Sequence, residues 1–201
     1  MKPSFFSLYP TTAATDSQDS QLNLKRRQIL KAGIGACALF TLPTAQAEIF
    51  KLAERKLAFL NLHTNERTQV TYWADGDYLS DGLSAINTIL RDHRTGETYP
   101  IDHQLLNMLQ LLHYKMSSKS EFHVISGYRS PQTNAQLNAK SSGVAKRSLH
   151  MQGMAIDIRM PGHNLSDLRN AALSLQAGGV GYYPGSNFIH IDTGRVRQWQ
   201  G

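Results

Sequence analysis

Two segments of the sequence place carboxylate and imidazole side chains within apolar runs. In the segment SLHMQGMAIDIRM, Asp157 stands between Ile156 and Ile158, in a stretch typical of a buried strand. Burying an ionised carboxylate is costly unless it is paired or bound to a metal ion. His150, seven residues earlier, is the first candidate partner.

The second segment is NFIHIDT, residues 187–193. Side chains alternate across a strand, so Ile189 and Ile191 share one face while His190 and Asp192 share the other. Each segment therefore offers a metal-competent side chain on the face opposite its isoleucines.

Together, His150, Asp157 and His190 are a candidate ligand set for catalytic zinc. Two histidines and one carboxylate leave a fourth position for water. A single buried histidine is more often a hydrogen-bonded core residue. It is the combination of the three residues that indicates a metal site.

The first 47 residues differ from the rest of the chain. Arg26 and Arg27 precede a modest apolar stretch at 32–42, and the small-x-small sequence AQA ends at Ala47. We interpret residues 1–47 as a cleaved twin-arginine export signal to the periplasm, with an ordinary Sec leader as the alternative. The apolar stretch is too short to span a bilayer, so we expect no stable membrane span after cleavage.

Residues 48–201 are expected to form one domain. The chain has 201 residues, of which 41% are hydrophobic, and a net charge of +6. Part of that charge lies in the leader, so the domain is mildly basic. This fits an anionic polymer such as a cell wall and predicts no nucleic-acid binding. The single cysteine, Cys37, lies in the leader, so the domain has no thiol nucleophile and no cysteine-based zinc site.

The elements that must position these residues are predicted from hydrophobic periodicity and capping residues. Strands are predicted at 55–64, 68–73, 121–127, 154–160, 180–183, 187–193 and 196–199, and helices at 81–94, after Asp102, after Ser130 and at 164–175. Helices come before and between clustered strands, which predicts an α+β fold with a largely antiparallel sheet.

The segment SLHMQGMAIDI resembles the Ser-x-His-x-x-Gly-x-Ala-x-Asp motif of the zinc peptidase superfamily of D-Ala-D-Ala carboxypeptidases, lysostaphin-like enzymes and the hedgehog fold. The segments FHVISGYRSPQTN and GGVGYYPGSNFIHIDTGRVRQW further resemble the family of murein endopeptidase K. The resemblance implies helices packed on the sheet, with one Zn²⁺ per chain on the sheet face. The implied zinc ligands are His150, Asp157 and His190.

The resemblance also implies an activity. It points to a periplasmic endopeptidase that cuts D-Ala–meso-diaminopimelate bonds, meso-diaminopimelate–meso-diaminopimelate bonds or both, in peptidoglycan cross-links. The alternatives are a D,D-carboxypeptidase that trims terminal D-Ala and a non-catalytic zinc-containing module that binds the wall. The expected partners are peptidoglycan peptide stems and an envelope adaptor or regulator, whose identity the sequence leaves open.

The general base is not evident from the motif. Carboxypeptidase relatives carry a Glu at the position of Asn187, and lysostaphin-like relatives carry a His at the position of Phe188. Asp192 is the remaining candidate for proton transfer. Its alternative role is to orient an imidazole as a hydrogen-bond partner.

Three further residues are candidates for contact with substrate. Arg129 follows a strand end and a glycine, and it could hold a substrate carboxylate or stabilise the oxyanion. Ser148 occupies the serine position of the motif and could bind substrate or fix its loop. Of the adjacent tyrosines, Tyr182 and Tyr183, either could line the cleft or belong to the core. Tyr182 is the one assigned to substrate binding.

Overall fold

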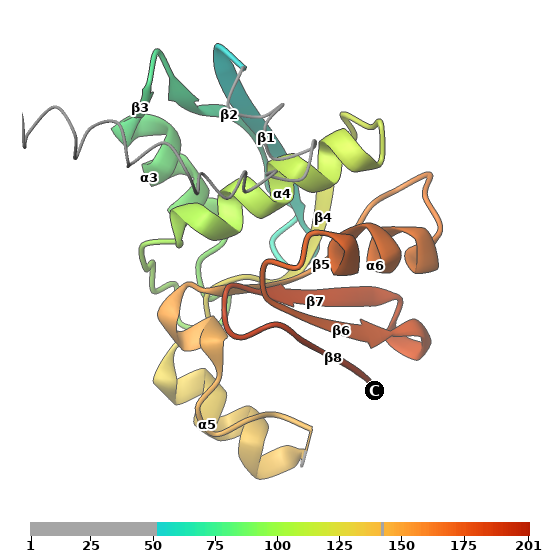
Figure 1. The fold of residues 1–201 in the computed structure, drawn as a ribbon. Coiled ribbons are helices and arrows are strands. Elements are labelled where there is room, and N and C mark those ends of the chain that lie inside the picture. The colour runs from blue at the N-terminus through green and yellow to red at the C-terminus, as the bar shows by residue number, and fades with distance from the viewer. Residues whose placement is uncertain (1–51, 142) are drawn as a thin grey trace, which may run out of the picture. The chain divides into compact units, whose positions relative to one another are not determined.

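The computed structural model describes residues 52–201 except residue 142 (Figure 1). The predicted export signal lies outside the described residues. Among the residues described, no helix is both long and apolar enough to cross a membrane.

The central feature is one sheet of eight strands among the described residues. Its strands are β1 Glu54–Asn61, β2 Arg67–Ala74, β3 Asp77–Tyr78, β4 Phe122–Ser126, β5 Ala155–Arg159, β6 Gly179–Tyr183, β7 Phe188–Asp192 and β8 Arg197–Gln200. The strand order is β3-β2-β1-β4-β5-β7-β6-β8. Only β1 with β4 and β6 with β8 pair in parallel, so the predicted, largely antiparallel α+β architecture is confirmed.

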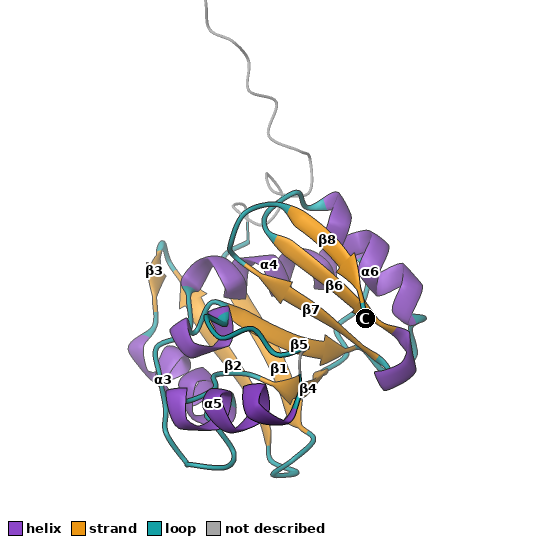
Figure 2. Ribbon diagram, turned by 90° about the horizontal axis from the view of Figure 1, so that it is seen from below, coloured by secondary structure: helices purple, strands orange, loops and turns teal. Residues whose placement is uncertain are grey.

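Helices cover the sheet unequally. The α-helices are α3 Ser80–Ile89, α4 His103–Lys115, α5 Pro131–Lys140 and α6 Leu165–Ser174, and the short 3₁₀ helices are η1 Leu149–Gln152 and η2 Pro184–Ser186. Helices α4 and α6 lie on one face, and α5 lies on the opposite side (Figures 1 and 2). The face of β5–β8 turned away from α4 and α6 is therefore available for a functional site.

Capping decides where two of these helices begin. The side chain of Asp102 accepts a hydrogen bond from the backbone of Gln104 at 2.9 Å, and α4 starts at the next residue, as predicted. Ser130 likewise accepts from the backbone of Thr133 at 3.1 Å, and Pro131 takes the first position of α5.

Helix α3 is shorter than the sequence predicts. It begins at Ser80, one residue before the predicted start, and its N-cap is Leu79. It ends at Ile89 instead of Arg94, because the backbone carbonyl of Leu90 accepts a hydrogen bond from Tyr128 at 2.7 Å. This long-range bond ties the chain to the end of β4 and competes with continuation of the helix.

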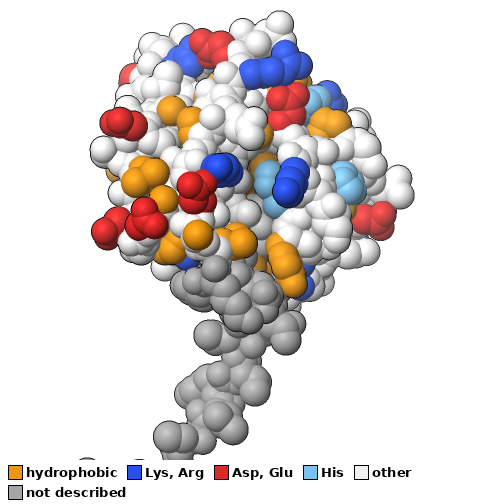
Figure 3. Space-filling model, turned by 90° about the horizontal axis from the view of Figure 1, so that it is seen from above, with side chains coloured by type: hydrophobic (Ala, Val, Ile, Leu, Met, Phe, Trp, Pro, Cys, Tyr) orange, Lys and Arg blue, Asp and Glu red, His pale blue; other side chains and the backbone are white. Residues whose placement is uncertain are grey.

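The core lies between the sheet and the helices α4 and α6. The isoleucines of β5 and β7 are fully buried against it, as are the leucines of α4 that face inward. Each fully buried aliphatic side chain of this kind contributes about 1.5–3 kcal/mol relative to its exposed state. Figure 3 shows the face opposite the β5–β8 site, where basic and acidic side chains are interspersed.

Candidate metal centre

Strand pairing brings the first two candidate ligands together. In the antiparallel register of β5 and β7, Asp157 lies directly opposite His190. Ile156 and Ile158 point to the core and are 0% exposed. The predicted alternation is thus confirmed, and it directs Asp157 and His190 to the open face of the sheet.

The third candidate ligand, His150, comes from the short helix η1. Ser148 caps η1 by accepting a hydrogen bond from the backbone of His150 at 3.3 Å. The chain then turns at Gly153, whose φ is 65° and where a side chain would collide with the carbonyl of Pro100. This tight turn carries His150 back over the start of β5.

Hydrogen bonds decide which imidazole nitrogen faces the site. His150 Nδ1 lies 2.7 Å from the carbonyl oxygen of Gly127, which can only accept, so Nδ1 carries the proton and Nε2 is available. His190 Nε2 lies 2.9 Å from Asp192 Oδ2, which leaves Nδ1 of His190 facing Asp157. Such partners fix the orientation of metal-binding histidines.

The three donor atoms converge as a metal site requires. Asp157 Oδ1 lies 2.8 Å from His190 Nδ1 and 3.3 Å from His150 Nε2, and the two nitrogens are 3.2 Å apart. Two ligands at tetrahedral zinc, each about 2.0–2.1 Å from the metal, lie about 3.3 Å apart. The spacing and the chemistry of the donors therefore fit a divalent cation such as zinc.

The ionised groups of the site shift one another's pKa. Burial opposes ionisation of Asp157, but the charges and hydrogen bonds of His150 and His190 hold its pKa below the ordinary value. Burial also disfavours charged His190, yet Asp157 and Asp192 raise the pKa of its imidazole to about 9. Asp157 and Asp192 thus favour the positively charged form of the His190 imidazole.

Asp192 is enclosed by hydrogen-bond donors. It is 0% exposed, and Oδ1 accepts from the backbone amides of Gly179 at 3.1 Å and Gly194 at 2.9 Å. Arg197 bonds both of its oxygens, at 3.0 and 2.7 Å. Burial alone would raise the pKa of Asp192, but His190 and Arg197 keep it below the ordinary value. This position favours the alternative role, orientation of the His190 imidazole, over proton transfer to substrate.

Arg129 lies beside the donor cluster. Its Nη2 is 4.0 Å from Asp157 Oδ2, and it also donates to Ser126 Oγ at 3.3 Å. Its Nη1 donates to Asn134 Oδ1 at 3.4 Å. Its Nε is buried and has no hydrogen-bond partner among the residues described. A guanidinium held only by contacts of 3.3–4.0 Å can shift to meet a charged ligand.

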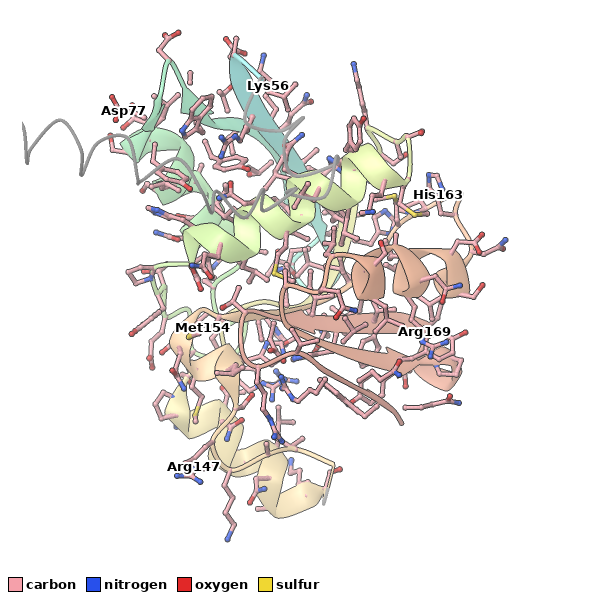
Figure 4. All side chains as sticks on the ribbon, in the orientation of Figure 1. Lys56, Asp77, Arg147, Met154, His163 and Arg169 are labelled. Carbon is pink, nitrogen blue, oxygen red and sulfur yellow. The ribbon has the colours of Figure 1, made fainter. Side chains whose placement is uncertain are left out.

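A cleft of about 510 Å³ opens over the donor cluster. One wall comes from η1 and the segment before it, and it includes Ser148 and Arg147. Figure 4 labels Arg147. The other wall comes from the tip of the β6–β7 hairpin and from β8, and includes Phe188 and Trp199. Ser148 and Arg129 both line this cleft, and their contact with substrate stays a prediction.

Tyr182 is assigned to the cleft by the sequence, but in the structure Tyr183 is the tyrosine among the residues that line it. Tyr182 pairs with the buried Ile189 and packs against the core, whereas Tyr183 pairs with Phe188 on the open face. Counting by twos along β6 from Val180, which is buried, would have placed Tyr182 on the core side.

Sequence reasoning also missed the contribution of β8. Trp199 Nε1 donates to the Tyr183 hydroxyl at 2.8 Å, and the Trp199 ring lies 5.2 Å from the ring of His190. Arg197 holds Asp192, as described above. No local pattern in RQWQ indicates these contacts, because they depend on where β8 joins the sheet.

The fold and the donor set define a class, the metal-dependent peptidases of the M15 type. The family model described as "Peptidoglycan L,D-endopeptidase MepK" matches residues 51–199. The chain belongs to this family.

Named relatives agree with the family match. The chain is 41% identical over 180 residues to Peptidoglycan L,D-endopeptidase MepK of Escherichia coli, covering 89% of this chain and 99% of that protein. The protein of the same name from Shigella flexneri is equally similar. Probable peptidoglycan L,D-endopeptidase MepK of Haemophilus influenzae is 37% identical over 179 residues, covering 88% of this chain and 96% of that protein.

Proposed function

We propose that this protein is a zinc-dependent peptidoglycan endopeptidase that hydrolyses L,D bonds in peptide cross-links. The observation that carries the proposal is the convergence of His150, Asp157 and His190 at the base of a cleft beside Arg129. The names of the relatives support the peptidoglycan substrate and the L,D bond.

The L,D bond in a cross-link joins two meso-diaminopimelate residues. It is one of the two cross-link bonds that the sequence resemblance implied as possible targets of the enzyme. On the acyl side of this bond stands a diaminopimelate with a long side chain that ends in a charged centre, whereas a D,D-carboxypeptidase has D-Ala there. A cleft of about 510 Å³ with Arg129 and Arg147 in its lining suits the carboxylate of such a residue.

The residues of the chain have distinct tasks in this reaction. A divalent metal held by His150, Asp157 and His190 would polarise the scissile carbonyl and activate water. Arg129 can donate to the oxyanion or to a substrate carboxylate with its guanidinium. Asp192 accepts the Nε2 proton of His190 and thereby keeps Nδ1 directed at the donor cluster.

The site of action follows from the substrate. Peptidoglycan lies outside the cytoplasm, so we propose that residues 48–201 act in the periplasm after twin-arginine export. The paired arginines and the AQA sequence support this route. Peptide stems are the proposed partners.

The test uses residues 48–201 with two purified muropeptide dimers, one with a diaminopimelate–diaminopimelate bond and one with a D-Ala–diaminopimelate bond. Products are separated by mass-resolved chromatography. We expect the first dimer to become monomers, and we expect the reaction to stop with a chelator and resume with added Zn²⁺.

The matched variants are His150→Ala and His163→Ala. His163 is partly exposed and lies away from the donor cluster (Figure 4). We expect activity to be lost in the first variant and kept in the second. Release of terminal D-Ala from intact dimers would instead show a carboxypeptidase. Zinc binding without any product would show a binding module.

A further inference from the structure

Strand β8 reaches the metal centre across two glycines of β6. In the parallel register, Gly179 lies beside Arg197 and Gly181 beside Trp199. A side-chain carbon at Gly181 would lie 2.6–2.8 Å from atoms of the Trp199 ring, and one at Gly179 would collide with the guanidinium of Arg197. The two glycines therefore leave the space that both β8 side chains occupy.

The space left by the two glycines lets Arg197 form a bidentate ion pair with the buried Asp192 at the edge of the cleft. Its Nη2 lies 2.7 Å from Asp192 Oδ2 and its Nη1 lies 3.0 Å from Asp192 Oδ1. Paired hydrogen bonds of this kind fix the plane of the carboxylate as well as its position. The Asp192 side chain is 0% exposed and that of Arg197 is 32% exposed, so Arg197 covers the carboxylate on the side of the cleft.

The same carboxylate controls the imidazole of His190. Asp192 Oδ2, which Arg197 holds, is the atom that lies 2.9 Å from His190 Nε2. The Arg197 guanidinium carbon also lies 4.9 Å from the centre of the Trp199 ring, and that ring lies 5.2 Å from the ring of His190. Arg197 thus contacts both Asp192 and Trp199, and each of these lies next to the His190 imidazole.

We propose that Arg197 is a positioning residue of the metal centre. It locks the Asp192 carboxylate in the orientation that presents His190 Nδ1 to the site shared with Asp157 and His150. The inference rests on the proposed metal-dependent function, and it assigns to β8 a role that the His–Asp–His motif does not include. Loss of the guanidinium is expected to weaken metal binding even though Arg197 is not itself a ligand.

The test measures metal binding by residues 48–201 directly. Zn²⁺ affinity is obtained by competition with a chromophoric chelator, and the geometry of the site is read from the visible absorption of bound Co²⁺. The variants are Arg197→Gln and Arg197→Lys. The matched control is Arg195→Ala, an exposed arginine in the same turn. Circular dichroism and thermal unfolding show whether each variant is folded.

We expect Arg197→Gln to bind Zn²⁺ about 10- to 100-fold more weakly than the unaltered protein and to shift the Co²⁺ spectrum. Arg197→Lys keeps the charge but loses the paired geometry, so an intermediate loss is expected. Arg195→Ala is expected to match the unaltered protein.

Zn²⁺ affinity within twofold of the unaltered protein in a folded Arg197→Gln variant would overturn the inference. If that variant does not fold, an unchanged affinity and Co²⁺ spectrum in Arg197→Lys would overturn it equally. Failure of the proposed function has a different signature: the unaltered protein would bind Zn²⁺ but leave both muropeptide dimers intact.

Discussion

Asp92 provides a quantitative test of how the segment that carries Arg129 is held. The side chain of Asp92 is 2% exposed and lies in the turn after α3. Its Oδ2 accepts from the backbone amide of Ser130 at 2.8 Å, and its Oδ1 accepts from that of Arg94 at 2.9 Å. Ser130 follows Arg129 directly and caps α5, so Asp92 anchors one wall of the cleft.

The size of the Asp92 contribution to the free energy of unfolding follows from the pKa of its carboxyl group. Burial alone would raise this pKa, but hydrogen bonds from Thr133 and from the amides of Ser130 and Arg94 lower it from 3.8 to about 2. The shift corresponds to about 2 kcal/mol of stability. Because the folded-state pKa is lowered, this contribution is complete above about pH 4 and is lost as the pH falls through about 2.

The assay is urea unfolding of residues 48–201 and of the Asp92→Asn variant between pH 7 and the acid limit of folding. We expect the variant to be less stable by about 2 kcal/mol at pH 5–7, with the difference shrinking below about pH 4. The exposed Asp77→Asn variant serves as a control and is expected to change stability by less than about 0.5 kcal/mol.

A difference between the unaltered protein and Asp92→Asn that stays constant with pH would refute the reasoning. It would mean that the effect arises from packing rather than from the ionised carboxylate.

The remaining predictions concern the cleft. Tyr183→Ala is expected to raise KM for the diaminopimelate-linked dimer roughly 10-fold, equivalent to about 1.4 kcal/mol, whereas Tyr182→Ala should lower thermal stability and leave KM unchanged. Gly181→Ala should displace Trp199 and change tryptophan fluorescence, and an unchanged spectrum would contradict the close approach. Arg129→Ala should lower kcat about 10²- to 10³-fold while Zn²⁺ affinity stays constant in the competition assay, since Arg129 is not a ligand.

Much of the donor set could be predicted from local sequence. An alternation of period two is a property of each strand by itself, so the positions of Asp157 and His190 opposite their isoleucines were predictable. The caps Asp102 and Ser130 act on backbone amides within three residues, and the structure confirms them. The family resemblance added the expected fold of the whole domain and its expected activity.

The role of Asp192 depended on contacts between distant segments. Asp192 alternates correctly for the open face, but four donors from β6, β8 and the turn between β7 and β8 enclose it. Such enclosure cannot be read from NFIHIDT alone. Tyr182 and Tyr183 are the same residue type, and the structure places Tyr182 opposite Ile189 on the core side and Tyr183 opposite Phe188 on the cleft side.

The sequence by itself determined which side chains could bind a metal and which face of each strand they occupy, because residue chemistry and the alternation of a strand are local. The tertiary structure decided that Asp157 lies opposite His190, that Gly127 orients His150, and that β8 brings Arg197 to Asp192. These outcomes depend on strand register and sheet order, which arise from the packing of the whole core around segments that are far apart in the chain.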